Sequence, residues 1–317
     1  MDSRFKVICR CITGSHLYGT ATPESDIDIR GIFIPTEEFY LGFMEKVEQV
    51  ESHKPDETYW EITKFFRLCC DNNPNILELL FVPLYSEYTE YYTREWEEIL
   101  VNRHLFLSSK ARHTFSGYAV SQLHRIKQHR EWLLNPPTKK PERQYFNLPE
   151  TNIITSDQIN AYDELLNRGE VLEIGLQTLE VLQKEKAYFN SVRHWKQYQT
   201  WKEERNKSRA ELEFKFGYDT KHASHLFRLI SEGIELLTKG TITFPRPEAK
   251  DLLDIRQGKY SYEDLMARID SDIDSAFTKI ENQIILPHSP NRKDTDKLCQ
   301  KLVKERLLTK NLGLKDD

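Results

Sequence analysis

Two carboxylates near the N-terminus are separated by a single residue, at the start of an apolar run. Asp26 and Asp28 flank Ile27, and Ile29 follows them. Because successive side chains of a β-strand point to opposite faces, this spacing predicts that both carboxylates lie on one face while the two isoleucines point into a core. Two such charges ~5 Å apart repel each other by about 3 kcal/mol at an effective dielectric constant near 20. The pair therefore predicts a cation between its members.

A turn of small residues precedes this pair and suits a phosphate. Hard oxygen ligands at short spacing favour Mg²⁺ or Mn²⁺, and Mg²⁺ is usually held by one or two carboxylates together with substrate phosphates. Gly14 allows close approach of the backbone, and Ser15 offers a hydroxyl and an amide at a predicted helix start, where anions are favoured. These residues predict a site for a divalent cation and a nucleoside triphosphate.

The same segment resembles the signature of the DNA polymerase β-like nucleotidyltransferase superfamily. The fuller string is Gly14-Ser15-His16-x-Tyr18-Gly19-Thr20 followed by Ser25-Asp26-x-Asp28-x-Arg30-Gly31. It is similar to a subfamily of predicted nucleotidyltransferases associated with RNA repair pathways in bacteria and phages. Four further segments agree with that subfamily, namely residues 64–68, 73–80, 134–137 and 221–229. The resemblance therefore runs along most of the chain.

The resemblance implies a reaction and the roles of the signature residues. Asp26 and Asp28 would bind two divalent ions, one carried in with the triphosphate and one that activates an acceptor hydroxyl. The acceptor oxygen would attack the α-phosphorus and pyrophosphate would leave. Ser15 and the backbone near Gly14 would hold the β- and γ-phosphates.

The superfamily also uses a third carboxylate on a neighbouring strand, which the resemblance places among three residues. Asp56 ranks first as the third metal ligand, because its separation from the segment 64–68 matches the family pattern. Glu57 and Glu61 stay as alternatives.

Four basic residues are candidates for contact with the nucleotide. Arg30 follows Asp28 by two residues, so on a strand it faces the same side and can contact a phosphate or anchor the carboxylates. Lys221, His225 and Arg228 share one polar stripe of a predicted helix. Three potential cations on one face suit a triphosphate or an RNA phosphate, and the alternative is a helix face that meets only solvent.

The elements that must position these residues divide the chain by pattern. Alternating apolar residues predict strands over 5–12 and 27–34, with the signature on their connection, and two short strands over 46–51 and 56–60. From residue 61 onward, the apolar residues recur at the spacing of a helix. We expect an α+β fold: a polymerase β-like mixed sheet with helices in a catalytic domain of residues 1–95, then a mainly helical domain of residues 96–317 that completes the cleft and contacts nucleotide or acceptor.

Composition limits the class of protein. The chain has 317 residues, of which 38% are hydrophobic and 30% charged, with a mean hydropathy of −0.65. It has no apolar signal core and no run of about 18 apolar residues, so we expect a soluble, cytoplasmic protein without a membrane partner. The five cysteines show no CxxC spacing, which predicts buried thiols rather than disulfides or a zinc site. A net charge of −5 argues against nonspecific binding of long nucleic acid.

The pattern supports nucleotidyl transfer more strongly than it supports any acceptor. The leading hypothesis is a metal-dependent enzyme that transfers a nucleoside monophosphate from a triphosphate to a hydroxyl, with an RNA 3′ end as the acceptor that the resemblance implies. One alternative is protein nucleotidylylation, in which Tyr, Ser or Thr of a partner receives AMP or UMP. Another is a silent sensor that binds nucleotide without turnover.

Overall fold

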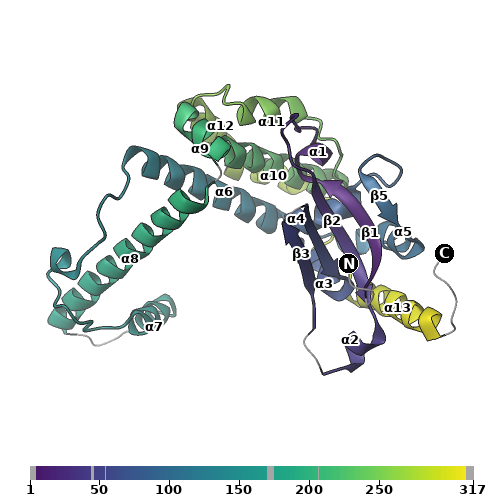
Figure 1. Cartoon of the computed structure of the whole chain (residues 1–317), viewed down its shortest axis with the longest axis horizontal. Coiled ribbons are helices and arrows are strands. Elements are labelled where there is room, and N and C mark those ends of the chain that lie inside the picture. The colour runs from purple at the N-terminus through teal and green to yellow at the C-terminus, as the bar shows by residue number, and fades with distance from the viewer. Residues whose placement is uncertain (1–4, 44–45, 54, 170–174, 206, 312–317) are drawn as a thin grey trace. The chain divides into compact units, whose positions relative to one another are not determined.

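A mixed five-stranded sheet occupies the N-terminal part of the chain, and helices make up most of the remainder (Figure 1). The computed structural model describes residues 5–43, 46–53, 55–169, 175–205 and 207–311. Its strands are β1 (Phe5–Thr13), β2 (Asp28–Pro35), β3 (Gln49–His53), β4 (Asp56–Glu61) and β5 (Thr89–Tyr92). No strand follows Tyr92 within these described ranges. The predicted α+β fold class, with a sheet first and a mainly helical region after it, is confirmed.

The sheet has the strand order β3-β4-β2-β1-β5. β2 pairs antiparallel with β1 and parallel with β4, and Asp28 of β2 lies opposite Asp56 of β4. The strand expected over 27–34 begins one residue later than predicted. Its ladder with β1 ends at the pair of Thr13 and Asp28, after which the chain leaves the sheet. Ile27 consequently lies outside the sheet with 49% of its surface exposed, and the prediction that it points into the core is wrong.

The two faces of the sheet are built differently. One face carries fully buried residues such as Cys9 and Ile32, and it packs on helix α3 (Ile62–Cys70). On the other face, Ile29, Phe33 and Tyr59 form a small apolar cluster. The ring of Tyr59 lies over Gly31, where a Cβ would come within 2.5 Å of it. All five cysteines are buried free thiols, as predicted.

Short helices connect the strands and long helices follow them. Besides α3, the connecting elements are α1 (Gly14–Tyr18), α2 (Glu37–Leu41), α4 (Pro74–Leu77) and η1 (Glu78–Phe81), while α5 (Arg94–Val101) and η2 (Arg103–Leu105) come directly after the last strand. The elements that follow are α6 (Ala111–Leu134), η3 (Arg143–Phe146), α7 (Ser156–Asn167), α8 (Leu176–Glu204), α9 (Lys207–Phe216), α10 (Thr220–Lys239), α11 (Ala249–Arg256), α12 (Tyr262–Lys279), η4 (Glu281–Gln283) and α13 (Arg292–Asn311). Within the described residues, none of these helices combines the length and the apolar character that crossing a membrane requires.

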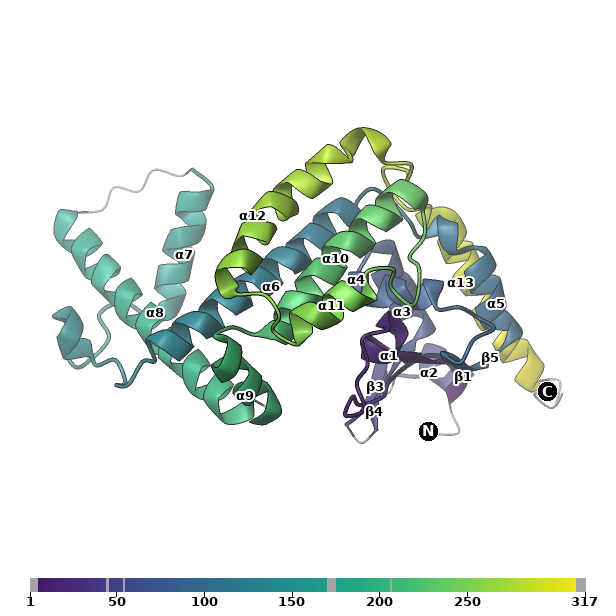
Figure 2. The ribbon, with the colours of Figure 1, turned by 90° about the horizontal axis from the view of Figure 1, so that it is seen from above.

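The chain forms two compact units. The first comprises residues 1–126 and 220–317, so the C-terminal helices belong with the sheet. Within it α10 packs against α11 and α12, and Figure 2 shows these helices side by side with the beginning of α6. The second unit, residues 127–219, contains α7, α8 and α9. The expected division into a catalytic domain of residues 1–95 and a helical domain of residues 96–317 stays a prediction.

Candidate active site

The signature turn forms the short helix α1, and a glycine stands at each of its ends. Gly14 begins the helix with φ of +64°, and Gly19 ends it with φ of +75°. A Cβ placed on Gly14 would overlap the Oδ2 atom of Asp28. Because only glycine lacks that carbon and readily adopts a positive φ, Gly14 lets the Asp28 carboxylate rest directly against the start of α1. The turn and the first strand aspartate thus form one site.

Asp28 and Asp56 lie side by side at the beginnings of two parallel strands. They occupy paired positions of β2 and β4, so their side chains leave the same face of the sheet. Burial is the main cause that raises the pKa of Asp28, and the Asp56 carboxylate, which shares a hydrogen bond with it, raises this pKa further. The charges of Arg30 and Lys221 act in the opposite direction. Two carboxylates held together in this way are an anionic pair that favours a cation.

Arg30 lies next to both carboxylates, on the face that strand alternation predicts. Its Nη1 atom donates a hydrogen bond to Oδ1 of Asp56 at 3.0 Å, and its Nη2 atom lies 3.9 Å from Oδ1 of Asp28. Nη1 also donates to the carbonyl oxygen of Ile29 at 2.8 Å. The guanidinium therefore neutralises part of the charge of the pair.

Asp26 lies outside this cluster. It belongs to the exposed segment that precedes β2, and its carboxylate makes no hydrogen bond or ion pair with a described residue. The expectation that Asp26 shares a strand with Asp28 is wrong, because β2 begins at Asp28. Asp26 is still only two residues away along the chain, and its role as a metal ligand stays a prediction.

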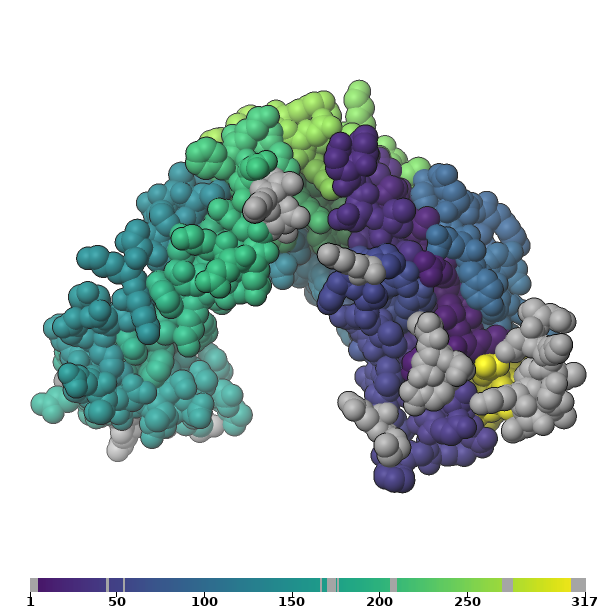
Figure 3. Space-filling view, viewed as in Figure 1, coloured from purple at the N-terminus to yellow at the C-terminus, as the bar shows by residue number. Residues whose placement is uncertain are grey.

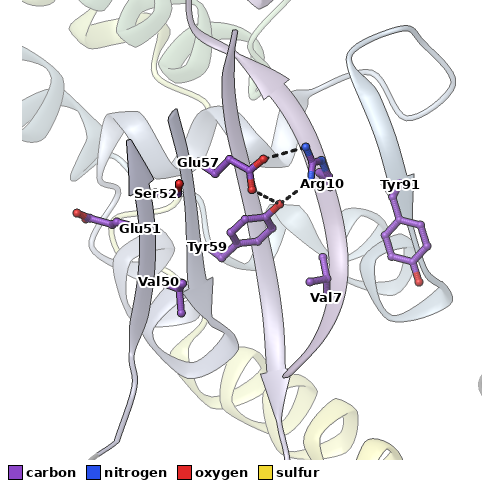
Figure 4. Close-up of a pocket in the computed structure, with 8 residues that line it drawn as sticks. All are labelled: Val7, Arg10, Val50, Glu51, Ser52, Glu57, Tyr59 and Tyr91. Atoms are coloured by element: carbon purple, nitrogen blue, oxygen red, sulfur yellow. Dashed lines mark hydrogen bonds and ion pairs between the residues drawn. The ribbon is translucent and has the colours of Figure 1, made fainter. Parts of the chain in front are cut away.

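The other two candidates for the third carboxylate have partners elsewhere. Glu57 faces the opposite side of the sheet, where it accepts hydrogen bonds from Arg10 at 2.9 Å and from Tyr59 at 3.1 Å. Figure 4 shows this group in a pocket that strands β1, β3, β4 and β5 line. Glu61 is fully buried and caps α3, accepting from the backbone amides of Thr63 and Lys64. The geometry therefore favours Asp56 over both alternatives.

Helix α10 brings one exposed cation to the carboxylates. Lys221 lies in the first turn of α10, is exposed, and is close enough to lower the pKa of Asp28. His225 follows one turn later. Burial, followed by the charge of Arg228, lowers the pKa of His225 to about 2, so its imidazole is neutral at pH 7. Its buried Nε2 atom has no hydrogen-bond partner among the described residues.

Arg228 differs from the expectation that it presents a charge to a phosphate. Only 5% of its surface is exposed, and its guanidinium donates to the carboxylates of Glu78 and Glu232. It also lies 4.0 Å from the ring centroid of Tyr18, the last residue of α1. The polar stripe on α10 therefore runs from an exposed end at Lys221 to a buried end at Arg228, whose positive charge is already paired.

This buried cluster attaches the signature turn to the rest of the first unit. The Tyr18 hydroxyl donates to Glu78 at 2.6 Å, and the Tyr18 carbonyl accepts from the Arg246 amide at 3.2 Å. Burial is the main cause that raises the pKa of Glu232 to about 8. Figure 3 shows the purple signature segment against the light green segment that contains α11. A Cβ added to Gly19 would lie 3.0 Å from the Cβ atom of Pro245. The helical part of the unit thus fixes the position of α1.

Sequence reasoning missed the residues of this cluster as a group. The spacing of Arg228 and Glu232, four residues apart on one helix, is a signal that could have indicated their ion pair. Glu78 lies 150 residues from Arg228 along the chain, and no local pattern connects them.

The chemistry of the donor set fits a divalent cation. Carboxylate oxygens from Asp28 and Asp56 meet on one face, and a positively charged guanidinium already lies against both. Hard oxygen donors of this kind suit Mg²⁺ or Mn²⁺, with the remaining ligands coming from water or phosphate. Nothing in the arrangement selects one of these ions over the other.

Comparison with known proteins agrees with the geometry. Residues 1–140 match the family model RlaP, described as RNA repair pathway DNA polymerase beta family, which confirms the resemblance that the signature predicts. An uncharacterized 38.9 kDa protein of the nrdC-mobD intergenic region of Enterobacteria phage T4 is 26% identical over 300 residues, covering 85% of this chain and 88% of that protein. The uncharacterized protein YcgL of Bacillus subtilis (strain 168) is 31% identical over 78 residues, which are 24% of this chain and 30% of YcgL. No solved structure matches the chain significantly.

Proposed function

We propose that this protein, whose residues 1–140 match the RNA repair pathway DNA polymerase beta family, transfers a nucleoside monophosphate from a triphosphate to a hydroxyl group and releases pyrophosphate. The single observation that carries the proposal is the pairing of Asp28 with Asp56 against Gly14 at the start of α1. The family match supports the reaction class.

The residues around the pair have roles that follow from their chemistry. Asp28 and Asp56, with Asp26, would hold Mg²⁺ or Mn²⁺, and the bound ions would supply positive charge to the triphosphate and to the attacking oxygen. Gly14 lets phosphate oxygens approach the backbone, and the Ser15 hydroxyl can donate to one of them. Transfer then depends mainly on alignment of the acceptor with the α-phosphorus.

The basic residues complete the phosphate side of the site. Lys221 is an exposed cation beside Asp28 and suits the phosphates that leave as pyrophosphate. Arg30 has a planar fork of donors that matches phosphate oxygens. His225 stays a predicted nucleotide contact; its Nε2 atom is buried and has no protein partner in the described residues, so the imidazole would have to turn toward the nucleotide to bind it. Arg228 acts indirectly, through Tyr18 and α1.

An RNA 3′ end is the acceptor that we propose, and the family description supports it. The hydroxyl at that end provides the attacking oxygen, and the product is an RNA extended by one nucleotide. The predicted cytoplasmic setting stays a prediction.

Label transfer tests the proposal. Each of the four triphosphates, labelled at the α-phosphorus, is incubated with the protein, Mg²⁺ or Mn²⁺, and total RNA or cell lysate. We expect label in RNA, together with released pyrophosphate, and loss of both in Asp28→Asn. The control Glu48→Gln changes an exposed carboxylate that pairs with Arg67 on the surface, and it should keep full activity. Label in protein instead would favour nucleotidylylation of a partner, and no transfer to any acceptor would favour a silent sensor.

A further inference from the structure

The guanidinium of Arg30 occupies the space beside the carboxylate oxygens that the proposed function assigns to a metal. It donates to Oδ1 of Asp56 at 3.0 Å and to the carbonyl oxygen of Asp56 at 3.3 Å, and it lies 3.9 Å from Oδ1 of Asp28. A quarter of the Arg30 side chain is exposed, so the contact lies at the open side of the site. One cation of the protein therefore already uses these acceptors.

A divalent ion and the guanidinium need the same lone pairs. The Oδ1 atom of Asp56 is the atom that accepts from Arg30 and is also a metal donor under the proposed function. Two positive groups at neighbouring positions repel each other, and a metal ligand cannot keep a full charge-assisted hydrogen bond on the same lone pair. Metal and guanidinium therefore compete for the pair.

We propose that Arg30 is an exchangeable counter-ion of this site: it neutralises Asp28 and Asp56 when no metal is bound, leaves Asp56 when a divalent cation enters, and then binds the triphosphate. This inference rests on the proposed function and extends it to the order in which the metal ion and the triphosphate bind. Arg30 thereby lowers the affinity of the site for a metal ion alone. It raises the affinity for a metal ion that is bound to a triphosphate.

Two features of the chain favour exchange over a permanent structural bond. The guanidinium is partly exposed and lies at the end of a long side chain, so it can move without disturbing the core. The Arg30 side chain also projects from the same face of β2 as Asp28. After release from Asp56, the guanidinium therefore stays beside the oxygens of a bound phosphate chain. The buried Arg228 has neither feature, since it is 5% exposed and paired with two carboxylates.

Binding measurements on the full chain test the proposal without any turnover. Mn²⁺ alone is titrated into the wild type, Arg30→Gln and Asp56→Asn and followed by electron paramagnetic resonance, and the complex of Mn²⁺ with inorganic tripolyphosphate is titrated separately. We expect Arg30→Gln to bind Mn²⁺ alone ~10-fold more tightly, because its competitor is gone, and the tripolyphosphate complex ~10-fold more weakly. Asp56→Asn should weaken both.

Two further variants keep the test decisive. Arg67→Gln removes an arginine that forms an exposed pair with Glu48, and it should leave both affinities unchanged. Arg30→Lys keeps the charge but loses the planar fork, so Mn²⁺ should bind as in the wild type while the tripolyphosphate complex binds more weakly. Circular dichroism verifies that each variant is folded.

The outcomes separate this inference from the proposed function. Unchanged or weaker binding of Mn²⁺ alone to folded Arg30→Gln overturns the inference, because Arg30 then either strengthens metal binding or has no effect on it. Tighter binding of Mn²⁺ in Arg30→Gln, in a protein that transfers no nucleotide to any acceptor, supports the inference and refutes the proposed function. Mn²⁺ binding that is insensitive to Asp56→Asn overturns both.

Discussion

Gly14 is the residue on which the geometry of the site depends most directly. The Asp28 carboxylate lies where the side chain of any other residue at position 14 would begin, and the backbone there has a φ of +64°. A single missing carbon therefore allows the start of α1 and the Asp28 carboxylate to meet.

Gly14→Ala should lower activity strongly while the protein stays folded. The added Cβ must push the Asp28 carboxylate away from α1, and the positive φ strains an alanine, so we expect a loss of at least ~100-fold in nucleotide transfer and a decrease of about 1–2 kcal/mol in the free energy of unfolding. Denaturant unfolding and label transfer measure the two effects. The control Gly117→Ala adds a Cβ with no atom within 4 Å in helix α6, and it should keep full activity. Full activity in Gly14→Ala would contradict the close contact.

Local pattern predicted part of the site at this scale. Strand alternation placed Arg30 on the face of Asp28 because both lie within one regular strand, and the structure has them there. Asp26 was misplaced because nothing in the sequence marks where the ladder with β1 ends. The ladder ends where α1 begins, at Gly14, one residue after the last paired residue of β1.

At the scale of elements, α1 is held by a buried ionic cluster. Tyr18 of α1, Glu78 of η1, and Arg228 and Glu232 of α10 bring three elements together. Two carboxylates share one guanidinium at its centre, so the arrangement is stable only while that charge is present.

Arg228→Met should therefore lower the free energy of unfolding, and it should not weaken nucleotide binding selectively. It leaves the buried carboxyl groups of Glu78 and Glu232 without the guanidinium that donates to both of them, and we expect the free energy of unfolding to fall by about 3–5 kcal/mol. Tyr18→Phe removes one hydrogen bond to Glu78 and should cost about 1–2 kcal/mol. Chemical denaturation compares the two variants with the wild type. A stable Arg228→Met protein whose KM for triphosphate is raised would instead restore Arg228 as a phosphate ligand.

His225 makes the stability of α10 depend on pH. Its pKa is about 2 in the folded protein and about 6.5 in the unfolded chain, so the unfolded state takes up a proton first as the pH falls. The contribution of neutral His225 to the free energy of unfolding is complete above pH 6.5. Below that pH it falls by about 1.4 kcal/mol per pH unit. Between pH 6.5 and 5, the unfolding free energy of the wild type should fall by about 2 kcal/mol more than that of His225→Gln.

Denaturant unfolding at a series of pH values measures this difference. His104→Gln, which changes an exposed histidine, serves as the control and should follow the wild type. Parallel pH profiles for the wild type and His225→Gln would show that the imidazole is not buried as described.

The position of the candidate active site depends on segments that lie far apart in the chain. The family match ends at residue 140, whereas the compact unit that contains the sheet also includes residues 220–317. The periodicity of the apolar residues predicted a sheet followed by helices, because it reports local structure. It could not predict that α10 and α11 return to α1, since contacts such as that of Glu78 with Arg228 join residues 150 positions apart.

A fragment of residues 1–140 should consequently fail to fold cooperatively. It keeps the buried Glu78 and its partner Tyr18 but lacks Arg228, and it exposes the surface on which α10 packs. Circular dichroism with thermal unfolding should show a broad, weak transition for the fragment and a sharp one for the full chain. A sharp transition in the fragment would show that the helices of the C-terminal part are not needed for the sheet to fold.

A comparison of two neighbouring residues of β4 tests the assignment of the active site most directly. Asp56 faces the paired carboxylate of Asp28, while Glu57 faces the opposite side of the sheet and binds Arg10. Transfer of α-labelled nucleotide is measured for Asp56→Asn and Glu57→Gln under identical conditions. We predict that Asp56→Asn lowers the rate by ~10³-fold or more while Glu57→Gln stays near the wild type. Equal rates in the two variants, or a loss confined to Glu57→Gln, would contradict the assignment of the active site.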